Sequence, residues 1–186
     1  MHKGFTLVEL LIVIAILAVL SVTVVVVLNP AELLKQARDS TRISDLASVN
    51  SAIALYLTDV ASPGIGGTGN AACSSRAGRV TGATTTSPFA GGMTPTTGVT
   101  STAVDGTGWV TVHLANITGG SPLARLPLDP TNAGNYYYAY ACGNGSALNY
   151  ELDTNLESTK YSGYMLSAKD GGNNDSAYEV GNSLTQ

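Results

Sequence analysis

The sequence predicts an α+β fold in which a long N-terminal helix, first apolar and then amphipathic, packs on a small antiparallel β-sheet. Three observations support this prediction. An almost unbroken apolar run lies near the start of the chain, and a helical repeat of apolar residues follows it. Short stretches that alternate apolar and polar side chains occupy the C-terminal part. The length of 186 residues fits one such domain with an appendage.

The apolar run extends from Leu10 to Leu28 and is interrupted only by Ser21 and Thr23. At about 1.5 Å per helical residue, these 19 residues can cross a hydrocarbon core of about 30 Å. A secretory signal peptide would have a shorter apolar core and a small-residue cleavage site after it. Nothing after Leu28 has that character, so we expect a transmembrane helix.

Glu9 is the unusual residue of this segment. A carboxylate in a membrane helix costs several kcal/mol unless it is paired, neutralised or near the headgroups, which makes Glu9 a candidate functional residue. Alternatively, Glu9 is a solvated residue of the helix start, where the positive end of the helix dipole favours it. The residue alone leaves both interpretations open.

The stretch from Lys3 to Leu11, KGFTLVELL, joins a basic leader, a Gly-Phe pair, a glutamate four residues on and a spanning apolar run. It resembles the class III leader and N-terminal segment of type IV pilins and of their relatives, the type II secretion pseudopilins and competence pilins. The resemblance covers about residues 1–57. It implies a pilin-like fold, in agreement with the α+β prediction.

The resemblance also implies how the chain is processed. Residues 1–4 would be a prepilin leader, which a membrane prepilin peptidase removes by cutting between Gly4 and Phe5, and Phe5 would then be N-methylated. The new amine of Phe5 lies one helical turn from Glu9. If helices stack with an axial offset, the amine of one subunit can neutralise Glu9 of the next in low dielectric, so both are predicted assembly residues.

These features predict a structural subunit of a type IV pilus-like filament. Residues 5–28 would be the transmembrane and polymerisation helix. Expected partners are other copies of the chain, the prepilin peptidase, an assembly platform protein and an ATPase. The subunit would sit in the inner membrane before assembly and in a cell-surface filament, or a periplasmic pseudopilus, afterwards.

The sequence leaves two alternatives open. Within the same class, the chain could be a pseudopilin of a type II secretion or competence system. From a different class, it could be a membrane-anchored binding module that does not polymerise.

Residues 29–60 have the pattern of an amphipathic helix. Pro30 predicts either a kink or a helix that restarts with Asn29 as its cap and Pro30 at its first position. Apolar residues then recur at helical spacings of 3 and 4, namely Leu46, Val49, Ile53 and Leu57. The charged residues between the apolar positions of this helix are expected on a solvated or inter-subunit face, namely Arg38, Asp39, Arg42 and Asp45.

Residues 61–108 are rich in Gly, Ser and Thr and predict a long connection with at most one short hairpin. From Trp109 onward, alternating runs predict the sheet domain, residues 109–186. The first alternating run is 109–114. The second run is 136–142. Alternation there places Cys142 on the same face as Tyr138 and Tyr140, and a hairpin turn is predicted after it at 143–145. Shorter runs are 148–152, 161–168 and 177–180.

The chain contains two cysteines, Cys73 and Cys142, both beyond the membrane segment. For a domain outside the cytoplasm, a disulfide between them is the simplest interpretation, and two unpaired buried thiols are the alternative. The formal charge of −4, without a cluster of basic and aromatic residues, argues against dedicated nucleic-acid binding.

Asp170, Asn173 and Asp175 concentrate oxygen ligands in one loop, which Ca²⁺ prefers. Major pseudopilins carry calcium in a similar late loop, although the same residue types also form ordinary turns. No other cofactor is predicted. The chain offers no paired nucleophile and base, so an enzyme is not expected, and three carboxylates near a predicted strand are expected to be solvated: Glu151, Asp153 and Glu157.

Overall fold

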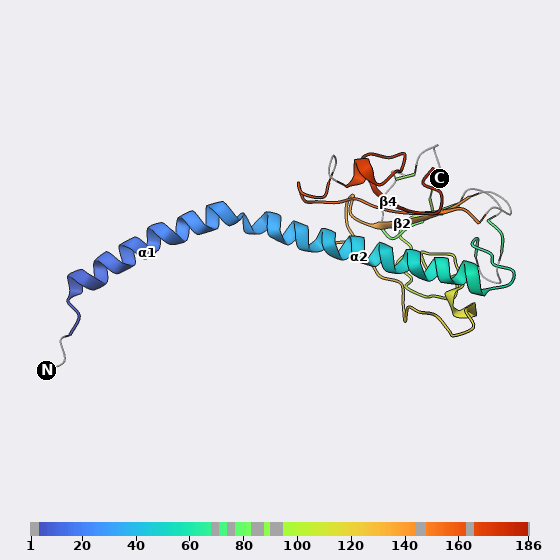
Figure 1. Ribbon diagram of the computed structural model, residues 1–186, viewed down its shortest axis with the longest axis horizontal. Helices are drawn as coiled ribbons and strands as arrows, with labels where there is room; N and C mark the ends of the chain where they lie inside the picture. Colours follow the sequence, from blue (N-terminus) through green and yellow to red (C-terminus); the bar gives the residue numbers. More distant parts are fainter. Residues whose placement is uncertain are drawn as a thin grey trace.

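The computed structural model describes residues 4–67, 71–73, 77–82, 88–89, 95–143, 148–162 and 166–185; of Val26 and residues 77–79 it describes the backbone alone. Two long helices are followed by a polar head that contains a small sheet (Figure 1). The helices are α1 (Leu7–Leu28) and α2 (Pro30–Asp59), and the strands are β1 (Ala77–Val80), β2 (Tyr138–Cys142), β3 (Tyr150–Thr154) and β4 (Tyr178–Gly181). Two short 3-10 helices are η1 (Leu114–Asn116) and η3 (Ser167–Lys169).

Helices α1 and α2 form one bent rod, and α1 projects away from the head (Figure 1). The bend lies at Asn29, whose backbone is left-handed with φ 41°. The Asn29 side chain accepts a hydrogen bond from the backbone N–H of Glu32 at 3.4 Å, and Pro30 occupies the first turn of α2. Asn29 therefore caps α2 and Pro30 begins it, as the second of the two interpretations predicted.

The C-terminal half of α2 packs against the sheet. Its predicted apolar stripe is confirmed, because Leu46, Val49 and Ile53 are fully buried in the main core. The prediction that the charges lie on a solvated or inter-subunit face is wrong at Asp39 and Arg42, which are fully buried within the chain on this same side of the helix. Their burial is possible because distant segments bring charged partners to them.

The four strands form an antiparallel sheet in the order β1-β2-β3-β4, which confirms the α+β fold. Strand β1 lies in the stretch that the sequence predicted as a connecting loop. It pairs with β2 in a register that runs from Ala77 opposite Cys142 to Val80 opposite Ala139. The sheet therefore begins before residue 109.

The two faces of β2 alternate as predicted. Tyr138, Tyr140 and Cys142 point into the core that α2 covers, whereas Ala139 and Ala141 belong to a second small cluster with Val80 and Phe89 on the outer face. Strands β2 and β3 pair as an antiparallel hairpin. Residues 144–147, which include two positions of the predicted turn, lie outside the described residues.

The predicted strand at 109–114 is wrong, because this segment is irregular and ends in η1. Consecutive residues Trp109, Val110, Thr111 and Val112 are all buried, so neither side of the segment faces solvent as a half-buried strand would require. The indole Nε1 of Trp109 donates to the carbonyl of Pro127 at 2.9 Å. The alternating residues therefore form a buried loop and not a strand. Of the shorter predicted runs, 177–180 contains most of β4, and 161–168 forms turns and the start of η3 where it is described.

Candidate functional site

The N-terminal segment presents the predicted processing residues in the open. Gly4 and Phe5 precede α1, they are not helical, and Phe5 is 86% exposed. A Cβ added at Gly4 would meet nothing within 4 Å. No residue that the structure describes therefore blocks access to the Gly4–Phe5 peptide bond.

Thr6 and Glu9 form a reciprocal cap at the start of α1. The Thr6 hydroxyl accepts a hydrogen bond from the backbone N–H of Glu9 at 3.3 Å. In return, Oε2 of Glu9 accepts from the backbone N–H of Thr6 at 2.8 Å and from its hydroxyl at 2.7 Å. This is a capping box, which satisfies two backbone N–H groups of the first turn. In the single chain, Glu9 thus has the helix-start role that the sequence offered as the alternative.

Helix α1 is apolar around its whole circumference. Every large apolar side chain that the structure describes between Leu7 and Leu28 is at least 47% exposed. The hydroxyls of Ser21 and Thr23 donate to the carbonyls of Leu17 and Leu20, so they present no unsatisfied donor. Among the described residues, only the helical rod Leu7–Asp59, through its α1 part, is long and apolar enough to cross a membrane. Such a surface requires lipid or other apolar helices around it.

The head is attached to α2 by a buried ionic cluster of Asp39, Arg42, Asp129 and Glu157, which we call the Arg42 cluster. Arg42 donates to Asp129 through Nε at 2.6 Å and through Nη2 at 3.1 Å. Its Nη1 contacts Asp39 at 2.8 Å and its Nη2 contacts Glu157 at 2.6 Å. The guanidinium also lies 4.9 Å from the centroid of the Tyr136 ring. Each of these charged groups therefore has an ionic or hydrogen-bonding partner, as burial demands.

Asp39 and Glu157 extend the Arg42 cluster to the backbone that follows β3. Asp39 accepts hydrogen bonds from the backbone N–H groups of Glu157 and Ser158 and from the Ser158 hydroxyl. Arg38 donates two hydrogen bonds to Glu157 from the exposed side. Hydrogen bonds from Arg38, and then those from Arg42, lower the pKa of Glu157 to about 2. The cluster therefore joins α2 to two segments of the head by charge as well as by apolar packing.

Sequence reasoning missed the Arg42 cluster and placed Glu157 in solvent. Asp39 and Arg42 are three residues apart, which is also the spacing of ordinary surface pairs on helices. Asp129 lies 87 positions after Arg42. Its only distinctive sequence feature is its place in a predicted bend, between Pro127 and Pro130. No local signal linked these positions.

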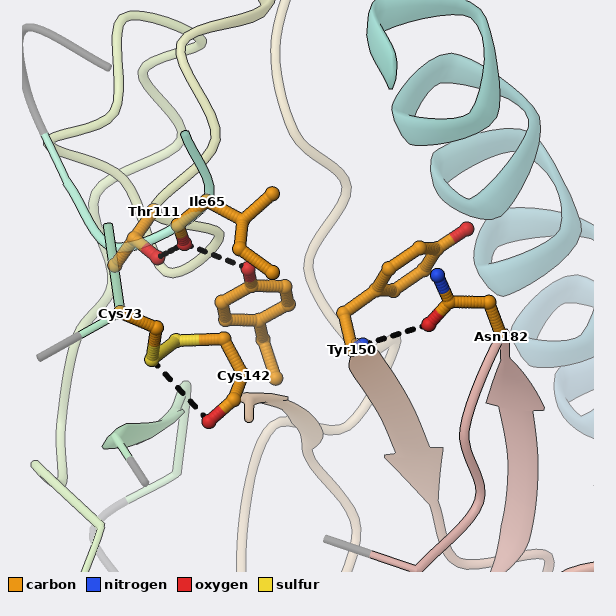
Figure 2. The surroundings of a disulfide bond; sticks show 7 residues. Ile65, Cys73, Thr111, Cys142, Tyr150 and Asn182 are labelled. Atoms are coloured by element: carbon orange, nitrogen blue, oxygen red, sulfur yellow. Dashed lines mark hydrogen bonds between the residues drawn. A yellow bond between two sulfur atoms is a disulfide. The ribbon is translucent and has the colours of Figure 1, made fainter. Parts of the chain in front are cut away.

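A disulfide joins Cys73 to Cys142, with 6.1 Å between the two Cα atoms (Figure 2). It links the segment after α2 to the end of β2. Beside it, the carbonyl of Ile65 accepts hydrogen bonds from the hydroxyls of Thr111 at 2.6 Å and Tyr140 at 2.8 Å. Figure 2 also shows Asn182 accepting from the backbone N–H of Tyr150, at 2.8 Å. Long connections are thus held at one end of the sheet.

The prediction that Glu151 and Asp153 are solvated is also wrong. Both side chains are fully buried on the face of β3 that points away from α2. In the predicted calcium loop, Asp170 accepts hydrogen bonds from the backbone N–H groups of Gly172 and Glu179. Asn173 and Asp175 are exposed. Calcium binding by Asp170, Asn173 and Asp175 remains a prediction.

Residues 1–25 match the family model described as the prokaryotic N-terminal methylation motif, the signature of type IV pilins and pseudopilins. The match includes the processing residues, Glu9 and most of α1, but not α2 or the head. No curated protein and no solved structure matches the chain. The N-terminal segment is therefore of the pilin type, and this points to a structural subunit anchored in the inner membrane.

Proposed function

We propose that this protein is a structural subunit of a type IV pilus-like filament. The observation that carries the proposal is α1, an apolar helix without a polar face that stands clear of the head and follows a methylation motif. Lipid covers this helix in the inner membrane, and the α1 helices of other subunits cover it in the filament. The exchange of lipid for helix packing keeps the apolar surface out of water at both stages.

Processing comes first. The prepilin peptidase cuts between Gly4 and Phe5, and Phe5 is N-methylated. The exposed, non-helical backbone at these residues supports this step, because a protease binds its substrate in an extended form. Removal of residues 1–4 leaves a cationic amine one residue before the Thr6 cap.

Assembly then pairs the Phe5 amine of one subunit with Glu9 of a neighbour. Both capping hydrogen bonds to the Glu9 side chain use Oε2. The other carboxylate oxygen can therefore receive a neighbour's amine without loss of the cap. An unpaired Glu9 among apolar helices would cost several kcal/mol, so the pair sets the axial register of the subunits.

The remaining partners follow from this route. A platform protein in the membrane and an ATPase drive extraction of the processed subunit. The heads, which have polar surfaces, face outward from the packed α1 helices. The product is a filament at the cell surface; a periplasmic pseudopilus built in the same way is the related alternative.

The test separates the charge of Glu9 from its capping role. Cells would express the wild type, Glu9→Gln or Thr6→Ala, and sheared surface material would be imaged by electron microscopy. Gln preserves a side-chain acceptor for the capping box but removes the charge, whereas Thr6→Ala removes the hydroxyl of the cap and keeps the charge. We expect Glu9→Gln to reach the membrane and lose most of its filaments, and Thr6→Ala to retain them.

Wild-type levels of filament from Glu9→Gln would refute the charge pairing. Mass spectrometry of the N-terminus supplies the second readout, with methylated Phe5 as the expected first residue. A native protein that keeps Met1 and never appears in polymers would refute the filament proposal. That result would favour the anchored binding module.

A further inference from the structure

Three acidic side chains converge on the outer face of the sheet, on the side opposite α2. They are Glu151 and Asp153 of β3 and Glu179 of β4, and we call them the strand carboxylates. Their exposed fractions are 0%, 0% and 1%. One oxygen from each lies within 4.8 Å of the others.

The strand register brings these carboxylates together. Asp153 pairs directly with Glu179 across β3 and β4. Glu151 lies two residues before Asp153 and so projects from the same face, whereas Tyr150 and Leu152 project into the core under α2. The convergence is therefore a property of the sheet and not of one flexible loop.

The loop between η3 and β4, which we call the covering loop, lies directly over Glu179 of the strand carboxylates. Asp170 accepts the backbone N–H of Glu179 at 2.8 Å, and the backbone N–H of Asn174 donates to Oε2 of Glu179 at 3.1 Å. The side-chain amide of Asn174 donates to the carbonyl of Pro88 at 2.7 Å. A Cβ at Gly172 would collide with the Glu179 carboxylate, so the loop lies directly against it. Glu179 is therefore enclosed between this loop and the sheet.

The strand carboxylates have fewer hydrogen-bonding and ionic partners than the carboxylates of the Arg42 cluster. Within the described part of the chain, neither oxygen of Asp153 accepts a hydrogen bond, and Oε1 of Glu179 accepts none. The ion pairs formed by described residues also do not include these two acids. Burial, together with repulsion from the neighbouring acids, raises the pKa of Asp153 well above its usual value and that of Glu179 to about 8. At neutral pH these acids therefore hold protons unless a cation takes the place of the protons.

We propose that Glu151, Asp153 and Glu179 bind a Ca²⁺ ion. Hard carboxylate oxygens suit Ca²⁺ and Mg²⁺ better than zinc, which prefers nitrogen and sulfur ligands. The three oxygens lie within 4.8 Å of one another, close enough to share one ion. Mg²⁺ gives up its water reluctantly and usually keeps several water ligands, so a buried set of protein carboxylates favours Ca²⁺.

The bound ion fastens β3, β4 and the covering loop to one another. Each strand carboxylate can supply one or two oxygens, and water can complete the coordination. The ligands are distinct from Asn173 and Asp175, which point to solvent. The inference does not depend on filament formation, because it concerns the stability of the head.

The experiment uses the full chain in detergent, stripped with EDTA, and follows thermal unfolding and calorimetric titration with CaCl₂ or MgCl₂. For the wild type we expect one Ca²⁺ per chain, a rise in Tm with Ca²⁺, and a smaller rise with Mg²⁺. Asp153→Asn should abolish both the calorimetric heat and the Tm rise. Asp175→Asn makes the same chemical change at an exposed position of the covering loop. It should leave the calorimetric heat and the Tm rise intact.

A second measurement shows whether Asp153→Asn remains folded. Because the substitution removes an acid whose ionised form is disfavoured by burial and by its acidic neighbours, we expect its Tm in EDTA to equal or exceed that of the wild type. Absence of a Ca²⁺ response from the wild type would overturn the proposal. So would a response lost in Asp175→Asn but retained in Asp153→Asn, because the ion would then be bound by the loop.

Discussion

Arg42 and Asp129 form a bidentate ion pair, and both side chains are completely buried. They are separated by 87 positions in the chain, and their contact joins α2 to the bend that precedes β2. Asp39 and Glu157 occupy the remaining sides of the guanidinium. The head is therefore fixed on α2 by a set of charges that only the folded chain brings together.

Loss of Arg42 should be strongly destabilising. Arg42→Ala leaves Asp39, Asp129 and Glu157 without their shared cation, and breaking a buried pair in this way costs about 3–5 kcal/mol in free energy of unfolding. Denaturant unfolding of the full chain in detergent measures the change. Arg38→Ala is the control, because Arg38 is 37% exposed and its loss should cost about 1 kcal/mol or less. Equal effects of the two substitutions would contradict the central place of Arg42.

Glu157 should make the head sensitive to acid. Its pKa is about 2 in the folded protein, below the usual value of 4.5, so the folded state favours the ionised form. This contribution to stability is present above pH 4.5 and is lost as the pH falls from 4.5 towards 2. We expect Glu157→Gln to be less stable than the wild type at pH 7 and to show a flatter decline over that range. Parallel pH profiles of the two proteins would show that other groups control the transition.

The disulfide should stabilise the head by restricting the unfolded chain. Its cysteines are 69 positions apart, and closing a loop of this length is worth about 4 kcal/mol in the chain-entropy model. Replacement of both Cys73 and Cys142 by Ala should lower the free energy of unfolding by a comparable amount. Reductant should destabilise the wild type and leave the double variant unchanged. If the wild type had the same free energy of unfolding with and without reductant, even when the reductant was added to the unfolded chain, the result would argue against the disulfide.

The two ends of α2 should respond differently to the loss of apolar side chains. Ile53 is fully buried against the sheet, so Ile53→Ala should cost about 2–5 kcal/mol in free energy of unfolding. Leu34 is 62% exposed near the start of α2, and Leu34→Ala should change the stability of the head by about 0.5 kcal/mol or less. Tm measurements on both variants test this contrast. A large loss of stability from Leu34→Ala would mean that the head packs on Leu34 itself, beyond the hydrogen bonds that Thr159 donates to Glu32 in the first turn of α2.

Part of the fold was predictable because it depends on neighbouring residues. The helical spacing of Leu46, Val49 and Ile53 identified the buried stripe of α2, and alternation in β2 placed Tyr138 and Cys142 on one face. The same logic failed at Trp109 and Val110. Alternation there suggested a strand, but core residues surround the segment on every side, and its hydrogen bonds go to loops.

Charged residues show the limit of local reasoning most clearly. Asp39, Arg42, Glu151 and Asp153 all sit in patterns that are usual for solvated side chains, yet all four are buried. Burial of a charge depends on which partners reach it, and those partners come from segments far away in the chain. Short-range spacing carries no information about them.

The sequence by itself determined the pilin-type start of the chain, the membrane-length helix and a joint in the rod at Asn29 and Pro30, because each is a property of contiguous residues. Only the tertiary structure decided that Arg42 is enclosed by three acids and that Glu151, Asp153 and Glu179 meet on one face of the sheet. Strand register and helix docking set those distances. The free energy of a buried charge depends on distances in space, which the order of residues does not reveal.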